Sequence, residues 1–220
     1  MTEGQKFVLV GAAVAAGAVV LTRGGVMKKN PSLPIPNRVF SKTVIHPVLP
    51  RNKYYVAVNY LADGGRVGSD PDTYGNWYEK LECWQVHTGI DLNANTGGNS
   101  DAGDYVYCVA DGEVISAEYY SGWGGIIVVR HPQFGVRTRY AHINNFRVKV
   151  GDFVKMGQVI AQIAPGNANW SAHLHFDVYA KELAANHWCF CSRACVSKNY
   201  LDPSAWLIKQ KALTFLPTDD

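Results

Sequence analysis

Short apolar runs separated by glycine turns fill the chain from about residue 53 onward. The runs DYVYCVA and EVISAEYY flank Asp111-Gly112, a dipeptide that favours a β-hairpin turn. Further runs are IIVVRH after a glycine turn, VRTRYAHI after Phe134-Gly135, then VIAQI and AHLHFDVYA. A turn signal about every 8 to 12 residues is typical of a β-sandwich or barrel. The pattern therefore predicts a mainly β fold, an antiparallel sandwich or open barrel.

Two segments are expected to be helical. Asp202-Pro203 before SAWLIKQKAL provides an N-cap and a proline at the first helical position, which predicts a short C-terminal helix. Phe7 to Thr22 contains sixteen residues without a charge, which predicts an N-terminal hydrophobic helix. At ~1.5 Å per residue it spans about 24 Å, less than a hydrocarbon core of ~30 Å. We interpret it as a short membrane anchor, with a signal peptide or a buried helix as alternatives.

The chain divides into three predicted parts. Residues 1–25 are the hydrophobic anchor or signal segment, residues 26–52 form a Pro/Asn-rich linker, and residues 53–220 form the folded domain. A hydrophobic content of 47% with 18% charged residues is typical of a globular rather than a disordered chain. The net charge of +3 comes without a basic block, so no nucleic-acid partner is predicted.

The five cysteines are an odd number and cannot all pair within one chain. Cys189, Cys191 and Cys195 lie close together, with Cys83 and Cys108 upstream. Thiolate zinc sites usually show paired short spacings, which are missing here. Disulfides with a spare thiol, or buried thiols, are therefore favoured over a metal site, and the pairing stays open. Cys83 has no evident partner and is expected to be a buried thiol.

Histidines and an aspartate recur at spacings that suit a metal. His87 and Asp91 lie in H-T-G-I-D, and His173 and His175 form H-L-H. On an extended strand, residues two apart share a face, so each pair projects to one side. Gly89 would then leave room between the first pair for a metal and its water. Imidazole and carboxylate suit Zn²⁺, and three protein ligands with an open fourth position are typical of a catalytic site.

Each motif alone occurs by chance, but their order is more specific. H-x-G-x-D, then Y-A-H ending at His142, then H-x-H, resembles the lysostaphin-type (LytM-like) zinc metallopeptidases, which are peptidoglycan endopeptidases. The resemblance runs from about Trp84 to Leu207 and includes VYCVADGEVISA, GWGGIIVVRH, VKVGDFVKMGQVIAQI and YLDPSAWL. It implies the duplicated-hybrid-motif-like β fold of that family. It also implies a zinc-dependent endopeptidase acting on the stem or cross-bridge peptides of peptidoglycan.

The resemblance also implies a role for each polar position. His87, Asp91 and His175 would hold one zinc ion per chain. His142 and His173 would flank the scissile carbonyl, as general base and as stabiliser of the tetrahedral intermediate. This division agrees with general chemistry, because histidine titrates close to the pKa of ~7 of a zinc-bound water.

The chain departs from the family pattern in two places. PGNANWSA, with Trp170, replaces the usual glycine-rich turn before H-x-H, and NANTGGNSDAGD is inserted after Asp91. Both are expected to border the substrate groove, so the bond that is cleaved stays open. One alternative is an inactive wall-binding or hydrolase-activating domain. Another is a biotinyl or lipoyl-like carrier, with Lys155 in G-D-F-V-K-M-G-Q.

Four other polar residues lie outside the predicted ligand and catalytic positions. Asp177 shares a strand face with H-L-H, and either orients a ligand or is a surface carboxylate. His131 is expected to be structural, and His46 and His187 are assigned no role. The protein is expected to be membrane-anchored in the bacterial cell envelope with the catalytic domain facing the wall. A phage virion membrane is the alternative.

Overall fold

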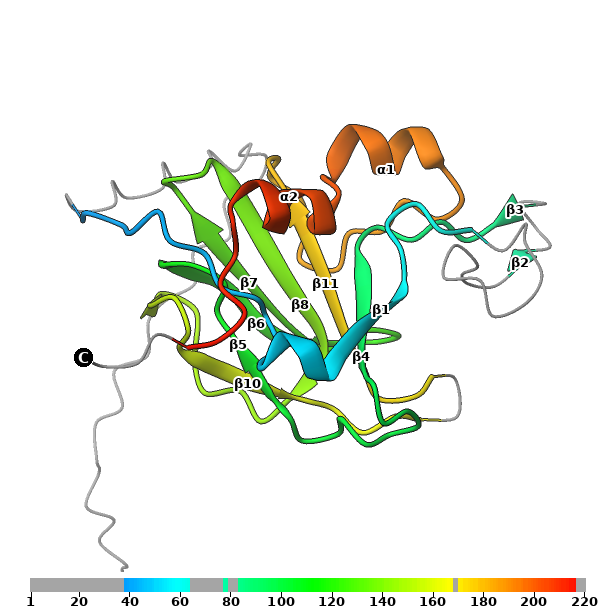
Figure 1. Ribbon diagram of the computed structural model, residues 1–220. Helices are drawn as coiled ribbons and strands as arrows, with labels where there is room; N and C mark the ends of the chain where they lie inside the picture. Colours follow the sequence, from blue (N-terminus) through cyan, green and yellow to red (C-terminus); the bar gives the residue numbers. More distant parts are fainter. Residues whose placement is uncertain (1–37, 64–76, 79–82, 168–169, 217–220) are drawn as a thin grey trace, which may run out of the picture. The chain divides into compact units, whose positions relative to one another are not determined.

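The computed structural model describes residues 38–63, 77–78, 83–167 and 170–216, with side chains left out at 77 and 78. The compact unit that contains the predicted site runs from Val39 to Asp220. Figure 1 shows its elements. They are η1 (Arg51–Lys53), β1 (Tyr54–Val58), β2 (Trp77–Tyr78), β3 (Cys83–Trp84), β4 (Ile90–Ala94), β5 (Tyr105–Tyr107), β6 (Gly112–Tyr120), β7 (Gly124–His131), β8 (Val136–Asn144), β9 (Phe153–Val154), β10 (Val159–Ile163), β11 (Leu174–Tyr179), α1 (Arg193–Asn199) and α2 (Pro203–Lys209). The predicted mainly β fold is confirmed.

The strands form one large antiparallel sheet. Its order is β1-β4-β11-β8-β7-β6-β9, while β10 pairs with the end of β8 and β5 pairs with β10. β2 and β3 form a separate small ladder. Strands β4 and β11, which carry most of the predicted ligands, are direct neighbours although they are far apart in sequence. Their register places His175 opposite Asp91.

The central strands are buried on both faces. In β7, Ile127 and Val129 pack into one hydrophobic core, together with Leu207 of α2. Ile126 and Val128 of the same strand pack into a second core on the other face. A strand covered on both sides reads as a continuous apolar run, which explains IIVV at this position.

One predicted hairpin is wrong. β5 and β6, on either side of Asp111-Gly112, do not pair with each other: β5 pairs with β10, and β6 pairs with β7 and β9. The reason is that the Asp111 carboxylate accepts hydrogen bonds from Met156 N and Lys155 Nζ, both at 3.0 Å, and so supports the turn before β10. The strands on either side of the other two glycine turns do pair, β6 with β7 and β7 with β8.

The C-terminal helix begins as predicted. The Asp202 side chain accepts a hydrogen bond from Ala205 N, and Pro203 occupies the first turn of α2. Helix α1, which the sequence pattern did not reveal, is capped by Ser192. Across the described part of the chain, no helix has the length and apolar character needed to cross a membrane. The predicted helix at Phe7 to Thr22 lies outside the described residues.

The folded unit begins before residue 53. Val44, Ile45 and Val48, from the range interpreted as a linker, are fully buried. Ile45 N donates to Val109 O at 2.8 Å, and His46 N donates to Leu213 O at 2.8 Å. The prolines in this segment break regular structure without preventing its apolar residues from packing, so the domain extends to Val39.

Disulfides join Cys83 to Cys191 and Cys189 to Cys195, and Cys108 is a buried free thiol. The expectation that Cys83 has no partner is therefore wrong. Its partner lies 108 residues away in the sequence, and only the fold brings the two together.

Candidate metal centre

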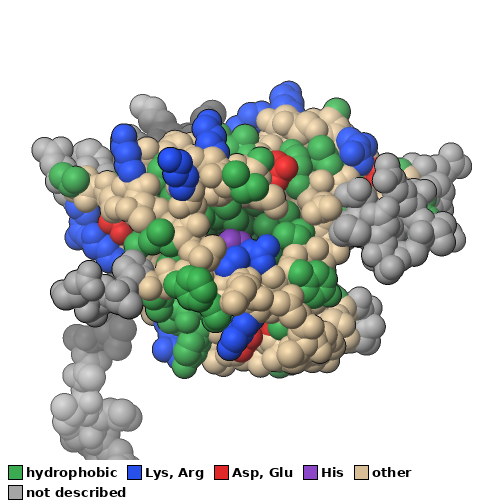
Figure 2. Space-filling view, in the orientation of Figure 1, with side chains coloured by type: hydrophobic (Ala, Val, Ile, Leu, Met, Phe, Trp, Pro, Cys, Tyr) green, Lys and Arg blue, Asp and Glu red, His purple; other side chains and the backbone are tan. Residues whose placement is uncertain are grey.

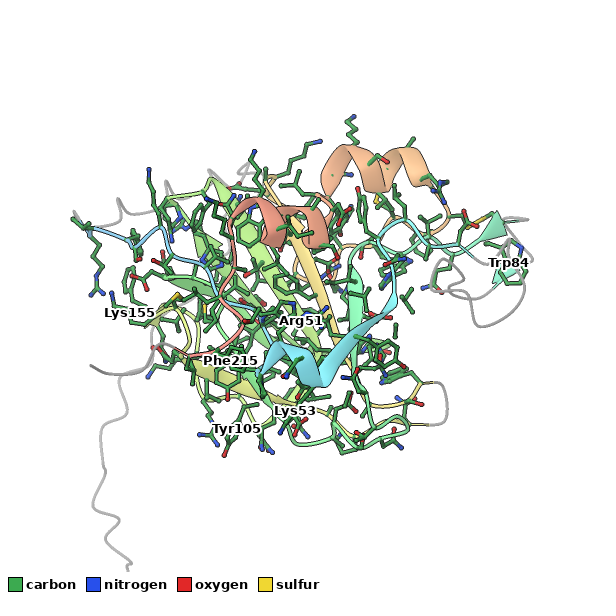
Figure 3. The ribbon with its side chains drawn as sticks, viewed as in Figure 1. Arg51, Lys53, Trp84, Tyr105, Lys155 and Phe215 are labelled. Carbon is green, nitrogen blue, oxygen red and sulfur yellow. A yellow bond between two sulfur atoms is a disulfide. The ribbon has the colours of Figure 1, made fainter. Side chains whose placement is uncertain are left out.

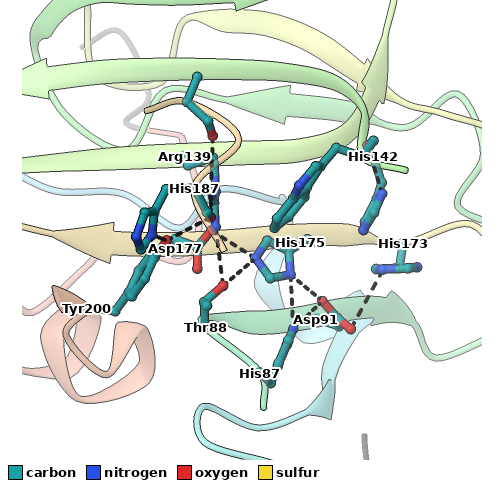
Figure 4. A network of polar contacts seen from close by, with 12 residues as sticks. His87, Thr88, Asp91, Arg139, His142, His173, His175, Asp177, His187 and Tyr200 are labelled. Carbon is teal, nitrogen blue, oxygen red and sulfur yellow. Dashed lines mark hydrogen bonds and ion pairs between the residues drawn. The ribbon is translucent and has the colours of Figure 1, made fainter. Parts of the chain in front are cut away.

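Three of the predicted residues converge on one point between β4 and β11 (Figure 4). His87 Nε2 lies 3.1 Å from Asp91 Oδ1 and 2.9 Å from His175 Nδ1, and His175 Nδ1 lies 3.0 Å from Asp91 Oδ1. All three side chains are buried. Ligands bound at 2.0–2.1 Å to a tetrahedral zinc would be about 3.3 Å apart, so the spacing fits a metal ion.

In both imidazole rings, the nitrogen that faces away from the metal position forms a hydrogen bond. The nitrogen that faces the metal position therefore keeps its lone pair. His87 Nδ1 lies 3.0 Å from the carbonyl of Asn59, which only accepts, so the proton is on Nδ1 and the lone pair on Nε2. His175 Nε2 lies 2.8 Å from Asp177 Oδ2, which leaves Nδ1 for the inner side. Such outer partners orient metal-binding imidazoles. Three electron-pair donors facing one another at about 3 Å repel unless a cation lies between them, so these residues fit a metal.

The electrostatics also favour a cation at this point. Burial alone lowers the pKa of His175, but the carboxylates of Asp177 and Asp91 outweigh it and raise that pKa to about 9. Burial alone raises the pKa of Asp91, but His87, His173 and His175 hold it well below its ordinary value. Without a metal ion, the group of His87, Asp91 and His175 therefore favours binding a proton. A metal cation at the same position would compensate the same negative charge.

Arg139 contacts Asp177, the residue that holds the His175 ring. No role was predicted for Arg139 from the sequence. It is fully buried on β8 directly opposite Asp177, and its Nε donates to the Asp177 carboxylate. Burial raises the pKa of Asp177, but Arg139 first and His175 second hold it well below its ordinary value. The available signal was the arginine within the apolar run VRTRYAHI, because a cation inside a buried strand needs an acidic partner.

Arg139 also joins the group to the segment that follows β11. Its NH1 donates to the carbonyls of Ala185 and His187 at 3.0 and 2.9 Å, and its NH2 donates to Thr88 Oγ1 at 3.2 Å. The guanidinium lies 4.3 Å from the centre of the Trp123 ring. One buried cation thereby holds three separate parts of the chain around the site.

His142 reaches the group through a β-bulge. The β7–β8 register pairs Gly125 with Ile143 and Ile126 with Ala141, so His142 is the extra residue, with a φ of +59°. Regular alternation would point His142 away from the face that Ala141 occupies, whereas a bulge re-aims a side chain. The His142 ring centre lies 4.6 Å from that of His173 and 5.9 Å from that of His175.

The two remaining predicted site residues share one hydrogen-bonding pattern. His142 Nδ1 lies 3.0 Å from the Trp123 carbonyl, and His173 Nδ1 lies 2.7 Å from the Ser171 carbonyl. In both rings Nε2 is therefore the nitrogen that can accept a proton. His173 Nε2 lies 3.7 Å from Asp91 Oδ2. Burial, followed by electrostatic interaction with the rings of His173 and His175, lowers the pKa of His142 well below its ordinary value.

An aromatic wall borders the histidines. The Trp170 ring centre lies 4.8 Å from that of His142, and Trp123 lies 5.3 Å from His175 and 4.9 Å from Trp188. Both departures from the family pattern meet beside this wall, because Asn99 of the insertion accepts a hydrogen bond from Ala172 N at 2.6 Å. The two segments thus contact each other beside the aromatic wall.

Two local expectations are corrected. His87 precedes β4 and reaches the group through a bend at Thr88 and Gly89, not through strand alternation. A Cβ at Gly89 would lie 2.3 Å from Phe176 O and 2.7 Å from Asp177 Oδ1, away from the inner ligand atoms. The glycine therefore allows β11 to approach closely and does not make room for a metal.

Other candidates have structural explanations. His131 is buried between the Asp111 carbonyl at 2.9 Å and Thr138 Oγ1 at 2.8 Å, as a structural histidine would be. Lys155 forms an ion pair with Asp111 at 3.0 Å, which gives no support to a carrier function. A second group of metal-binding residue types contains His187, Cys189 and Cys195, but its two sulfurs are joined in a disulfide.

Comparison with known proteins finds a family match over the domain that holds the site. Residues 85–187 match peptidase family M23. DD-carboxypeptidase/endopeptidase Mpg of Neisseria meningitidis is 33% identical over 97 residues, 44% of this chain and 21% of that protein. Peptidoglycan DD-endopeptidase ShyB of Vibrio cholerae is 33% identical over 95 residues, 43% of this chain and 21% of that protein. This chain therefore spans about a fifth of the length of each relative.

A solved structure agrees at the level of the fold. Lysostaphin from Staphylococcus simulans superimposes with a TM-score of 0.53 and 21% identity, covering 81% of this chain and 62% of that one. The metal group, His142 and His173 all lie within the residues that match the family. Over residues 85–187, which hold this site, the chain is therefore similar to peptidase family M23.

Proposed function

We propose that the protein is a zinc-dependent endopeptidase that hydrolyses peptide bonds in bacterial cell-wall peptidoglycan. The observation that carries the proposal is the buried group of His87, Asp91 and His175, with His142 and His173 beside it. Family M23 supports peptidase chemistry. The names of the relatives, a DD-carboxypeptidase/endopeptidase and a peptidoglycan DD-endopeptidase, support wall peptides as the substrate.

His87 Nε2, Asp91 Oδ1 and His175 Nδ1 would hold one Zn²⁺ per chain. When bound there, zinc supplies a Lewis acid for the peptide carbonyl and lowers the pKa of a bound water toward ~7. Asp177 keeps the His175 ring in the orientation that presents Nδ1, and Arg139 keeps Asp177 ionised within the core.

We assign proton transfer and oxyanion stabilisation to His142 and His173 together. The Nδ1 atom of each ring is held by a backbone carbonyl, so the ring stays fixed while Nε2 exchanges a proton. One Nε2 takes the proton of the attacking water and returns it to the leaving amine. The other, when protonated, donates a hydrogen bond to the developing oxyanion.

The proposal extends to location on the basis of the sequence. Phe7 to Thr22 would hold the chain in a membrane of the bacterial envelope, with the domain facing the wall. The same arrangement would suit a phage virion membrane. In either case the Pro/Asn-rich residues that follow the apolar segment would give the domain reach toward its substrate.

The test combines metal analysis with product analysis. Purified protein should contain one zinc per chain and should convert peptidoglycan sacculi into fragments that gain one water for each peptide bond cut. His175→Ala should lose both zinc and cleavage. The control His187→Ala, a histidine outside the metal group, should retain both. A zinc-loaded protein that cuts no peptide bond in any sacculus, or a protein that binds no zinc, would overturn the proposal.

A further inference from the structure

A cavity of about 320 Å³ lies between α2 and the segment formed by η1 and β1. It is on the opposite side of the sheet from the metal group, because Ile90 lines it and the next residue, Asp91, points to the other face. Figure 2 shows the surface hollowed near the centre of this face, with a histidine beside a basic side chain and hydrophobic side chains around them. The volume falls within the range of about 300–1,000 Å³ typical of ligand sites.

The lining combines an apolar surface with basic side chains and no acidic ones. Its apolar members are Val56, Ile90, Leu207, Ile208 and Ala212. Arg51 and Lys211 line the same cavity, and so do the hydroxyl-bearing residues Ser204 and Thr214. This composition is complementary to a molecule that has an anionic head group and an aliphatic part.

Arg51 is a half-buried cation that has no acidic partner among the described residues. Its guanidinium donates to the Tyr54 carbonyl, and within the described parts of the chain no carboxylate lies within ion-pair distance of it. Burial lowers its pKa from the ordinary value, which reflects the cost of removing the charge from water. An anion in the cavity would offset that cost. Figure 3 labels Arg51 on this face, together with Lys53 and Phe215.

His46 adds a buried ring nitrogen that has no hydrogen-bond partner among the described residues, although the ring also forms a hydrogen bond with the Val48 backbone. It lines the cavity and is 7% exposed, and its Nδ1 has no hydrogen-bond partner among the described residues. Burial, followed by the charge on Arg51, lowers its pKa to about 3, so the ring is neutral. Buried polar atoms are normally hydrogen-bonded, and exceptions often mark a missing partner.

The apolar lining of the cavity continues onto exposed side chains at the protein surface. Ile208 is 78% exposed on the outer side of α2, and Phe215 is 59% exposed. An aliphatic chain that leaves the cavity would cover this surface. Scattered apolar residues are ordinary at a protein surface, but these adjoin a cationic cavity.

We infer that this cavity binds a small anion carrying an aliphatic chain, with the head group at Arg51 and Lys211 and the chain against Leu207 and Ile208. Such a ligand is either a free alkyl phosphate or carboxylate, or the head group of a membrane lipid. Both present the same chemistry to the site. The site is independent of the proposed peptidase reaction, since its residues face the other side of the sheet.

Lys211 allows a test that separates binding from folding. It follows Gln210, the C-cap of α2, and has a φ of +53°, a conformation that favours glycine. Lys211→Gly therefore removes the charge and relieves backbone strain at once. The variant should unfold at the same temperature as the wild type or higher, so weaker binding by it would not come from misfolding.

The primary experiment is calorimetric titration of the full-length protein with n-octyl phosphate. We expect saturable binding of one ligand per chain, weakened at least tenfold by Arg51→Gln and by Lys211→Gly. Lys53→Gln is the matched control, because Lys53 is an exposed cation of η1 that does not line the cavity. It should change the affinity less than twofold. Octanoate should bind the same site, and inorganic phosphate at least tenfold more weakly.

Vesicles of phosphatidylglycerol distinguish a membrane lipid from a free molecule as the source of the ligand. Sedimentation with vesicles that is reduced by Arg51→Gln but not by Lys53→Gln would assign the ligand to a lipid, and equal sedimentation would assign it to a free molecule. Cleavage of sacculi should be unchanged in all three variants. The inference is overturned if octyl phosphate shows no saturable binding at millimolar concentration, or if Lys53→Gln weakens binding as much as Arg51→Gln.

Discussion

At the scale of single residues, the metal group depends on side chains that do not touch the metal position themselves. Asp177 fixes the His175 ring, and Arg139 compensates the charge of Asp177 inside a fully buried pair. A buried ion pair is costly to break, because the remaining partner stays charged in the core. The site therefore depends on these two residues in addition to its ligands.

Asp177→Asn should weaken both zinc binding and the fold. It removes the carboxylate that orients His175, which we expect to reduce zinc affinity by about 10- to 100-fold. It also leaves Arg139 unpaired, which should lower the free energy of unfolding by about 3–5 kcal/mol. Chelator competition and urea unfolding measure the two effects.

The matched double variant Arg139→Met/Asp177→Asn separates the two causes. It removes both charges of the buried Arg139–Asp177 pair, so neither is left unpaired, and it should be more stable than Asp177→Asn alone while its zinc affinity stays low. Equal stability of the single and double variants would contradict this explanation.

His142→Ala and His173→Ala should separate catalysis from metal binding. Neither residue is one of the three predicted zinc ligands His87, Asp91 and His175, so both variants should retain zinc. Each should lose turnover by about 10²-fold or more, because proton transfer or oxyanion stabilisation is lost. Elemental analysis and release of soluble fragments from sacculi are the readouts. Loss of zinc in His173→Ala with retention in His175→Ala would reverse the assignment within H-L-H.

At the scale of secondary structure, the site depends on two departures from regular strands. The bulge at His142 turns its ring to the face where Ala141 lies. The bend at Thr88 and Gly89 brings His87 to Asp91. Regular alternation of side chains along a strand would produce neither contact. The geometry of the site therefore depends on these two irregular positions.

Gly89→Ala tests the close approach of β4 and β11. The new Cβ would lie 2.3 Å from the Phe176 carbonyl, so the backbone of β11 would have to move. We expect a loss of about 1–3 kcal/mol in the free energy of unfolding, with weaker zinc binding because His175 and Asp177 flank Phe176. Unchanged stability and zinc content would show that β11 tolerates the displacement.

At the scale of the whole molecule, a buried neutral histidine makes stability depend on pH. Burial lowers the pKa of His131 to about 4, against 6.5 in an unfolded chain. Between these values the unfolded chain binds more protons, so the free energy of unfolding falls as pH drops from about 6.5 to 4. For one histidine the loss reaches about 3 kcal/mol.

His131→Asn isolates this contribution. The asparagine amide can replace Nδ1 as donor to the Asp111 carbonyl, and it does not titrate in this range. Loss of zinc in acid affects the wild type and the variant alike, so the difference between their unfolding curves from pH 7 to 4.5 reports on His131. Parallel curves would contradict the assignment.

The N-terminal segment leads to a separate prediction about the whole chain. The full-length protein should fractionate with membranes at an uncleaved mass, because Phe7 to Thr22 is uncharged and apolar. A variant that starts at Val39, where the compact unit begins, should be soluble and should still cleave sacculi. Loss of about 25 residues in the intact mass would indicate a signal peptide instead.

The sequence by itself was sufficient for the β architecture, the C-terminal helix and the chemistry of the ligand set. Short apolar runs between glycine turns, the Asp202 cap and the H-x-G-x-D and H-x-H spacings are local features, which a single sequence displays directly. The family resemblance also placed His142 near the site. Its position on a bulge is a property of strand pairing and was not visible in the sequence.

Only the tertiary structure decided the contacts between distant segments. It pairs Asp177 with Arg139 and Cys83 with Cys191, and it packs Val44 and Ile45 into the core from a segment that reads as a linker. It also encloses His46, a residue without an assigned role, in a cationic cavity. The physical reason is the same in each case: burial and charge compensation depend on which strands lie next to each other, and no local pattern specifies that.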